Sequence, residues 1–328
     1  MSVVSRKAVR SLVVLLGFWL SAPLTAGDIR ADTPDLLYTT LAAQPQFSGV
    51  GHTDFFDFCG GTLIAPNWVL TAAHVTNATT VTFGSGVYNV TQSLVDPNWN
   101  GNEVDGHDFR LLRINGNPIA DGNAGVIYPL YQGAILDRGI TNVGYGLTGT
   151  GVSGYIDGTQ GTRRAGNMVL RSFLLPGSTD FNNPASYSRT VTSGVVLADF
   201  INPDTGFSPL LAINGQPSTV SAQPLEYIIG PLDSGSPALI NDNGVWKIAG
   251  VASFILTQND NPGPFGIYGD VSGFSIFDDA TVQWIAATIA VPEPSTMAFL
   301  SLVVCGSIGG GWYHYRRQQR VENKVIHR

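Results

Sequence analysis

Cysteine and charged residues are both scarce in this chain. Its 328 residues include two cysteines, Cys59 and Cys305, and only 12% of the residues are charged whereas 44% are hydrophobic. Because Cys305 lies in a terminal apolar segment, we expect no disulfide bond within a folded domain. Stability must then come from burial of apolar side chains. A chain of this length can bury either one large core or two small ones.

Positive charge is scarcer than negative charge. The sequence has 17 Lys and Arg against 24 Asp and Glu, a formal net charge of -7. Nucleic-acid binding needs clustered Lys and Arg to neutralise phosphates, and the body of the chain has no such cluster. Paired His or Cys residues at metal-ligand spacing are also missing. We therefore expect no nucleic-acid partner, no metal site and no cofactor.

Glycine is abundant, with 39 residues, and Thr, Val, Ser and Asn are frequent. This composition favours short strands joined by tight turns. Alternating apolar and polar residues predict strands at Thr80–Phe83, at 87–94 and at Arg110–Ile114. Residues 28–51 are expected to form an extended segment that leads into the first strands. A linker around residues 116–125 is predicted to join two halves.

The amino-terminal segment, residues 1–27, has the pattern of a secretory signal peptide. Three basic residues precede the apolar run 12–20, and small residues continue to Gly27. We expect cleavage after Ala26 or Gly27. The alternative is an uncleaved membrane anchor, but about nine apolar residues are too few to span a bilayer.

The carboxy-terminal segment, residues 291–328, begins with Val-Pro-Glu-Pro. An apolar run at 297–312 follows, and then Arg316, Arg317 and Arg320. Arginines after an apolar segment stay on the cytoplasmic side of a membrane. The segment resembles the PEP-CTERM sorting tail of Gram-negative bacteria, which implies transient anchoring through a transmembrane segment at 297–312 and an exosortase-type processing enzyme as a partner. A plain single-span anchor is the alternative. Both place the body of the protein outside the cytoplasm, at the cell surface or in the medium.

The stretch at residues 59–75, CGGTLIAPNWVLTAAHV, contains the first candidate for chemistry. An apolar strand ends in Ala72-Ala73-His74. Small alanines leave room for a partner beside the ring, and a neutral imidazole accepts a proton near neutral pH. A half-buried histidine with a purely structural role is the alternative for this residue considered alone.

A second candidate lies at residues 106–113, GHDFRLLR, where a turn brings Asp108 to the start of an apolar strand. A carboxylate there can orient an imidazole, although a turn-capping aspartate has the same appearance. Asp105 is the less favoured alternative because it lies three residues from the strand.

A third candidate lies at residues 230–237, GPLDSGSP, followed by the apolar strand 238–240. A serine hydroxyl attacks a carbonyl only if a base takes its proton and the backbone turns sharply enough to present nearby N–H groups. Gly235 permits such a turn beside Ser234. The chain order is then His, Asp, Ser.

These three segments resemble those of the chymotrypsin-like (trypsin-like) serine peptidases. The resemblance implies an all-β fold of two six-stranded antiparallel β-barrels with a short C-terminal helix, in a domain spanning 28–290 and divided into 28–125 and 126–290. It implies a secreted bacterial endopeptidase that cleaves protein or peptide substrates through an acyl-enzyme. His74 would be the base, Asp108 its orienting carboxylate and Ser234 the nucleophile, with the N–H groups of Leu232 and Ser234 as the oxyanion hole.

Two positions differ from the family's usual pattern. Val75 replaces the cysteine that usually follows the histidine segment, which indicates a disulfide-poor bacterial branch. Leu232 replaces a glycine, so the backbone loses freedom at the oxyanion hole. This substitution motivates an alternative function, a weak or inactive surface or matrix binding protein on the same fold.

The resemblance also assigns residues that bind the substrate: Ile228, Ser253, Phe254, Ile255 and Gly266. Ile228 would lie at the base of the pocket and Ile255 at its mouth, which favours a small aliphatic side chain before the cleaved bond. Ser253 would also support the triad aspartate. In many members a freed amino terminus pairs with the aspartate before the nucleophile. Ile29 and Asp233 are the corresponding candidates here.

Overall fold

The structure is a computed structural model that describes residues 27–257 and 265–290. The predicted signal peptide, apart from Gly27, and the predicted sorting tail with its transmembrane segment lie outside the described residues. Among the helices that are described, none is long and apolar enough to cross a membrane.

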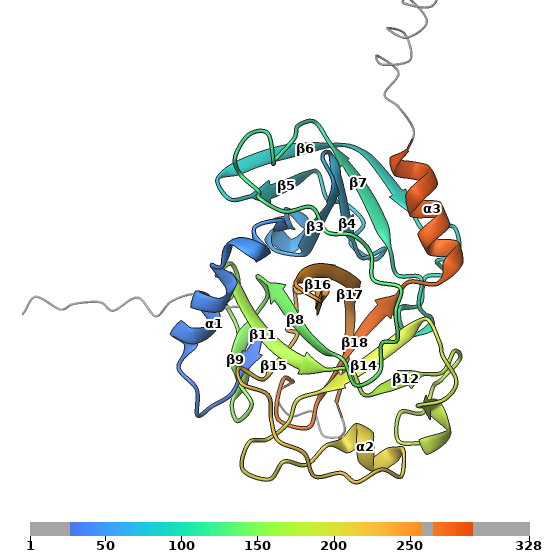
Figure 1. Cartoon of the computed structure of the whole chain (residues 1–328). Coiled ribbons are helices and arrows are strands. Elements are labelled where there is room, and N and C mark those ends of the chain that lie inside the picture. Colours follow the sequence, from blue (N-terminus) through green and yellow to red (C-terminus); the bar gives the residue numbers. More distant parts are fainter. Residues whose placement is uncertain (1–26, 258–264, 291–328) are drawn as a thin grey trace, which may run out of the picture.

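The first half of the chain forms a closed antiparallel barrel of six strands, which lies at the top of Figure 1. Its hydrogen-bonded order is β2-β3-β4-β7-β6-β5. The strands are β2 (Val50–Thr53), β3 (Gly60–Ala65), β4 (Trp68–Thr71), β5 (Thr80–Phe83), β6 (Gly86–Val95) and β7 (Arg110–Ile114). Apolar residues from several of these strands fill the interior, among them Leu63, Val69, Val81, Phe83 and Leu112. The three strands predicted from alternation are therefore confirmed.

The second half contains an eight-stranded antiparallel sheet with the order β11-β8-β16-β17-β18-β14-β12-β13. The strands are β8 (Gly139–Gly144), β11 (Arg164–Val169), β12 (Ser172–Leu174), β13 (Tyr187–Ser188), β14 (Val195–Asp199), β16 (Pro237–Asp242), β17 (Val245–Leu256) and β18 (Val271–Ile276). The sheet encloses its own apolar core, with Met168, Phe173, Ile240 and Phe274 among the buried side chains. The predicted all-β fold with two strand-rich halves is confirmed.

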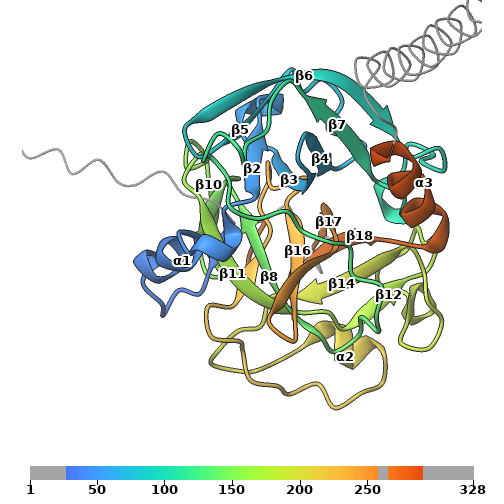
Figure 2. The ribbon, with the colours of Figure 1, turned by 45° about the horizontal axis from the view of Figure 1, so that its top comes forward.

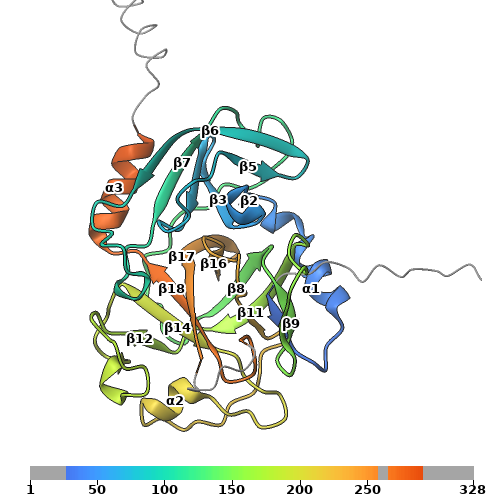
Figure 3. The same cartoon turned by 180° about the vertical axis from the view of Figure 1, so that it is seen from behind.

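A small third sheet brings the start of the described chain against the second half. Its order is β10-β9-β1-β15, with β1 (Asp28–Ile29), β9 (Thr148–Thr150), β10 (Gly154–Ile156) and β15 (Tyr227–Ile228). Asp28 pairs with Ile228, and Ile29 pairs with Tyr227. Figure 3 shows this sheet from behind, next to helix α1.

The described part of the chain also contains three α-helices: α1 (Asp35–Ala42), α2 (Pro209–Ile213) and α3 (Asp279–Ile289). Four short 3-10 helices are η1 (Pro45–Phe47), η2 (Phe55–Asp57), η3 (Glu103–Asp105) and η4 (Pro184–Ser186). The C-terminal helix was predicted and is confirmed. The side chain of Asp278 caps it by accepting a hydrogen bond from the N–H of Thr281.

Helix α1 overturns the expectation that residues 28–51 are extended throughout. Asp35 in its first turn accepts hydrogen bonds from two guanidinium nitrogens of Arg164, whose side chain is fully buried in β11. Leaving this guanidinium buried and unpaired would cost several kcal/mol, so the ion pair holds the helix against the sheet. Figure 2 shows α1 beside β11.

The two halves share one apolar seam. Trp68, Leu70 and Phe109 from the first half belong to the same buried cluster as Leu239 and Val251 from the second. Because residues at the ends of β4 and β16 meet here, side chains that are far apart in the chain come together at this seam.

Candidate active site

His74 lies just beyond the end of β4, where two buried alanines precede it. Its backbone N–H donates to Oδ1 of Asp108 over 3.0 Å, and its ring nitrogen Nδ1 lies 2.7 Å from Oδ2 of the same carboxylate. Nδ1 must be the donor in this contact because an ionised carboxylate only accepts. The double contact fixes both the backbone and the ring, and in the neutral ring it leaves Nε2 without a proton, as an acceptor.

Asp108 is fully buried between the two halves. The hydroxyl of Ser253 on β17 donates to its Oδ2, and its own N–H donates to the hydroxyl of Ser275. Arg110 donates two hydrogen bonds to the carbonyl of Ala73 and so ties β7 to the histidine segment. The prediction that Ser253 contacts the aspartate of the candidate triad agrees with this geometry.

The alternative aspartate, Asp105, has other partners. Its carboxylate accepts hydrogen bonds from the side chains of Asn100 and Asn102 and from the backbone N–H of Gly177. Asp105 therefore holds the loop before β7 in shape, and Asp108 is the carboxylate that contacts His74.

A second carboxylate near His74 was missed in the sequence. Oε1 of Glu103, on η3, lies 3.8 Å from Nδ1 of His74. Burial lowers the pKa of His74, but the hydrogen bond and the charge of Asp108 and the charge of Glu103 outweigh it, so the pKa is raised. The two carboxylates therefore stabilise the charged form of the His74 ring relative to its neutral form.

Ser234 lies in a sharp turn that packs against the histidine segment. The N–H of Gly60 donates to the carbonyl of Ser234 over 2.8 Å. Gly235 has a φ of +80°, and a Cβ on it would lie 2.1 Å from Oγ1 of Thr71, the last residue of β4. Only glycine fits this close approach. The turn of Ser234 thus packs against the end of β4, three residues before His74, and no hydrogen bond joins the Ser234 hydroxyl to the ring among the described contacts.

Leu232 adopts the left-handed conformation, with a φ of +75°. Neither its N–H nor that of Ser234 donates a hydrogen bond to any described residue, whereas the intervening N–H of Asp233 donates to the carbonyl of Gly230. The leucine therefore takes a backbone conformation normally left to glycine. Two unpaired N–H groups flank the nucleophile's turn, as an oxyanion hole requires.

Asp233 is buried, and its carboxylate accepts hydrogen bonds from the backbone N–H groups of Tyr145, Gly146 and Gly230. The hydroxyl of Tyr227 is a fourth donor at 3.3 Å. Burial raises the pKa of Asp233 to about 6, and these donors offset part of the increase. Ile29 is not among these partners. The predicted ion pair between Asp233 and Ile29 needs a free amino group, which forms only when the chain is cut before Ile29, and it stays a prediction.

Comparisons with known proteins agree with this geometry. The family model described as trypsin matches residues 42–173, which include the histidine and aspartate segments. Chymotrypsin-like elastase family member 1 from Macaca fascicularis is 27% identical over 256 residues, covering 72% of this chain and 80% of the relative. The Rattus norvegicus protein of the same name is 27% identical over 226 residues, covering 63% and 71%. The matches support a trypsin-like serine peptidase.

Identity to the trypsin-like relatives is higher over a shorter region. The Canis lupus familiaris protein of the same name is 39% identical over 74 residues, which is 18% of this chain and 29% of the relative.

The residues predicted to form the trypsin-like substrate cleft are placed as follows. Ser253 is buried, and Phe254 and Ile255 on β17 are half-buried. Ile228 is fully buried in β15, and Gly266 is buried with a φ of +83°. Their roles in substrate binding stay predictions.

Asp28 lies beside the predicted cleft, next to Gly266, and nothing in the sequence indicated a buried carboxylate there. A Cβ on Gly266 would be 2.0 Å from Oδ2 of Asp28. The carboxylate is fully buried, and neither oxygen has a hydrogen-bond partner among the described residues. Burial raises the pKa of Asp28 to about 9. The N–H of Gly149 lowers it in part, without reaching hydrogen-bond geometry, and the charges of Asp233 and Asp270 raise it further.

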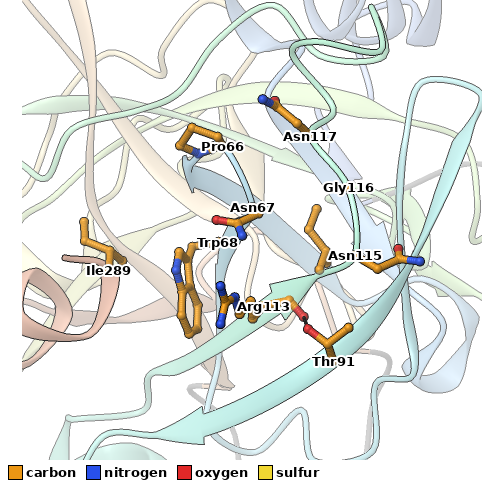
Figure 4. A pocket seen from close by; sticks show the side chains of 10 residues that line it. Pro66, Asn67, Trp68, Thr91, Arg113, Asn115, Gly116, Asn117 and Ile289 are labelled. Carbon is orange, nitrogen blue, oxygen red and sulfur yellow. Dashed lines mark hydrogen bonds between the residues drawn. The ribbon is translucent and has the colours of Figure 1, made fainter. Parts of the chain in front are cut away.

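A separate pocket of about 740 Å³ lies on the first barrel next to the end of α3. In Figure 4 the guanidinium of Arg113 lies near the indole of Trp68, and the distance from its Cζ to the ring centre is 5.7 Å. None of the candidate triad residues lines this pocket. The described residues contain no group of three or more His, Cys, Asp or Glu that could hold a metal ion.

Proposed function

We propose that the protein is a secreted serine endopeptidase that hydrolyses peptide bonds through an acyl-enzyme. The observation that carries this proposal is the contact of His74 with a fully buried Asp108 at the seam, beside the turn of Ser234. An imidazole whose Nδ1 is held by a buried carboxylate has the tautomer that a general base needs, because Nε2 is then free to accept a proton.

In the proposed reaction, the Ser234 hydroxyl oxygen attacks the carbonyl carbon of the scissile peptide while Nε2 of His74 takes the hydroxyl proton. The resulting oxyanion accepts hydrogen bonds from the N–H groups of Leu232 and Ser234. The carbon–nitrogen bond then breaks, and His74 gives its proton to the leaving amine. A water molecule, deprotonated by His74, releases the acid and restores Ser234.

Asp108 has a defined part in this sequence. It keeps Nδ1 protonated and stabilises the imidazolium that forms after the first proton transfer. The Ser253 hydroxyl donates to Oδ2 and so holds the carboxylate in place without competing for the ring proton. The contact that fixes His74 is thus itself fixed by β17.

The left-handed backbone at Leu232 supports the proposed oxyanion hole. Leucine restricts the backbone more than glycine does, yet the N–H of Leu232 has no partner among the described residues and its φ is positive. Loss of one such donor costs about 3 to 4 kcal/mol of transition-state stabilisation. Since both N–H groups remain, the proposal is an active enzyme rather than a binding protein on the same fold.

We also propose that the amino terminus of the mature chain completes the site. Gly27 lies against the Tyr227 ring, and its Cα is 3.3 Å from where a Cβ on Gly230 would be. Tyr227 and Gly230 both donate to the carboxylate of Asp233. Removal of a signal peptide after Ala26 would give Gly27 a positive charge beside this carboxylate and the unpartnered Asp28. Gly27, rather than Ile29, is then the end that pairs with Asp233.

The sequence patterns at the two ends support the proposed location. A signal peptide would export the chain, and the sorting tail would anchor it until an exosortase-type enzyme processes it. We propose a bacterial cell-surface or released peptidase, with a domain spanning 28–290.

Cleavage of a synthetic peptide library by the purified mature protein tests the proposed activity and reports which residue precedes the cut bond. The Ser234→Ala variant is the control, because it removes the nucleophile and leaves the fold of the turn intact. Cleavage by the wild type that the variant lacks supports the proposal. Equal cleavage by both proteins would indicate a contaminating peptidase and would count against it.

A further inference from the structure

A second negative charge faces the ring of His74. Glu103, on η3, places Oε1 3.8 Å from Nδ1, and its side chain is 40% exposed whereas that of His74 is 21% exposed. This separation is too long for a hydrogen bond, and Nδ1 already donates to Asp108. The interaction of Glu103 with the ring is therefore electrostatic. It is strongest when the ring is charged.

The charged groups that face the ring come from three segments. Asp108 lies before β7, Glu103 lies on η3, and Arg110 lies on β7. Asp108 and Glu103 raise the pKa of His74, and Arg110 lowers it. The guanidinium of Arg110 is held by the carbonyl of Ala73. Two carboxylates thus oppose one guanidinium around the imidazole.

We propose that Glu103 is a positioning residue that acts through His74, by stabilising the imidazolium formed when the ring takes the proton from Ser234. This inference rests on the proposed peptidase function. During the attack the Ser234 hydroxyl proton moves to Nε2, so a positive charge appears on the ring 3.8 Å from a carboxylate that has no other described partner. The interaction is weaker in the ground state, where the ring is neutral, and so it lowers the barrier.

The same interaction acts on the protonated ring in the free enzyme. The proposal therefore links the pKa of His74 to the rate of the reaction. Because Glu103 stabilises the charged ring equally in both settings, its removal lowers the pKa of His74 and lowers the rate at high pH by matching amounts. A partly exposed pair at this distance corresponds to a shift of about half a pH unit and a rate loss of about threefold. At low pH the two effects cancel, since a lower pKa makes more of the neutral base available.

The test uses the Glu103→Gln variant, which keeps the size and polarity of the side chain, and the Glu103→Asp variant, which keeps the charge on a shorter side chain. Asp157→Asn is the control, because it removes one negative charge from an exposed residue between β10 and β11 that is not among the charges acting on His74. The pKa of His74 is measured by NMR titration of labelled histidine, with His74→Ala assigning the signal. The pH dependence of kcat/KM is measured on a peptide substrate.

Glu103→Gln should lower both the NMR pKa and the acid limb of the kcat/KM profile by about half a unit. Its curve should join that of the wild type at low pH. Glu103→Asp should fall between them, and Asp157→Asn should match the wild type. An unchanged pKa of His74 in Glu103→Gln, or a rate loss equal at all pH values, would overturn the proposal. If the NMR pKa falls but no protein cleaves peptide, the proposed function fails and the electrostatic contact stands.

Discussion

Leu232 provides a direct test of the backbone conformation before Ser234, because residues other than glycine rarely adopt a φ of +75°. Replacing it with glycine relieves the left-handed strain, and replacing it with alanine does not. Both substitutions remove the half-buried leucine side chain beyond Cβ. The difference between the two variants therefore isolates the backbone strain from the loss of packing.

The magnitude follows from known conformational costs. A left-handed conformation costs a residue with a Cβ about 1 to 2 kcal/mol. Glycine loses more entropy on folding than alanine, by about 0.5 to 1 kcal/mol. The glycine variant should therefore be more stable than the alanine variant by about 0.5 to 1 kcal/mol. At a position with a negative φ the order is reversed.

Urea unfolding of the two variants measures this difference, and peptide hydrolysis measures the effect on the proposed oxyanion hole. Because glycine keeps the N–H, we expect kcat/KM of Leu232→Gly to stay within about threefold of the wild type. Greater stability of the alanine variant would refute the left-handed assignment. A gain of a hundredfold or more in the glycine variant would show that leucine keeps the hole from forming.

Two further predictions concern the buried carboxylates. Asp108→Asn should keep the fold but lower kcat by roughly 10⁴-fold, because an amide at this position favours the wrong tautomer of His74. Steady-state kinetics measure kcat, and circular dichroism is the folding control. A loss of less than tenfold would show that Asp108 has no part in the mechanism. A chain whose first residue is Gly27 should cleave peptide faster than one that keeps a short extension before Gly27. Equal rates in the two chains would rule out a role for the freed amino group beside Asp233.

The main features of the fold and the candidate triad were predictable from the sequence because they depend on local patterns. His74 and Ser234 each lie next to a run of apolar residues, and Asp108 lies next to a strand of alternating pattern. Their order in the chain is also informative. The seam that brings them together depends on pairing between distant strands, such as β16 with β17, which no local pattern specifies.

Three features were missed for different physical reasons. Helix α1 begins at Asp35 after Pro34, a helix-start signal, and its stability also depends on Arg164, which lies far away in the sequence. Glu103 lies in a polar loop whose shape depends on side-chain hydrogen bonds, so nothing in the sequence indicates that it faces His74. Asp28 was expected only to begin an extended lead-in segment, whereas its strand pairs with β15 and buries its carboxylate.

The central claim is that Ser234 is a nucleophile activated by His74 and Asp108. Reaction of the mature folded protein with a fluorophosphonate, followed by mass spectrometry, measures this directly, because the probe labels a serine only when a base activates it. We predict one label, on Ser234, which disappears in Ser234→Ala and is strongly slowed in His74→Ala. Absence of label on the wild-type protein, or a label that persists in Ser234→Ala, would contradict the account.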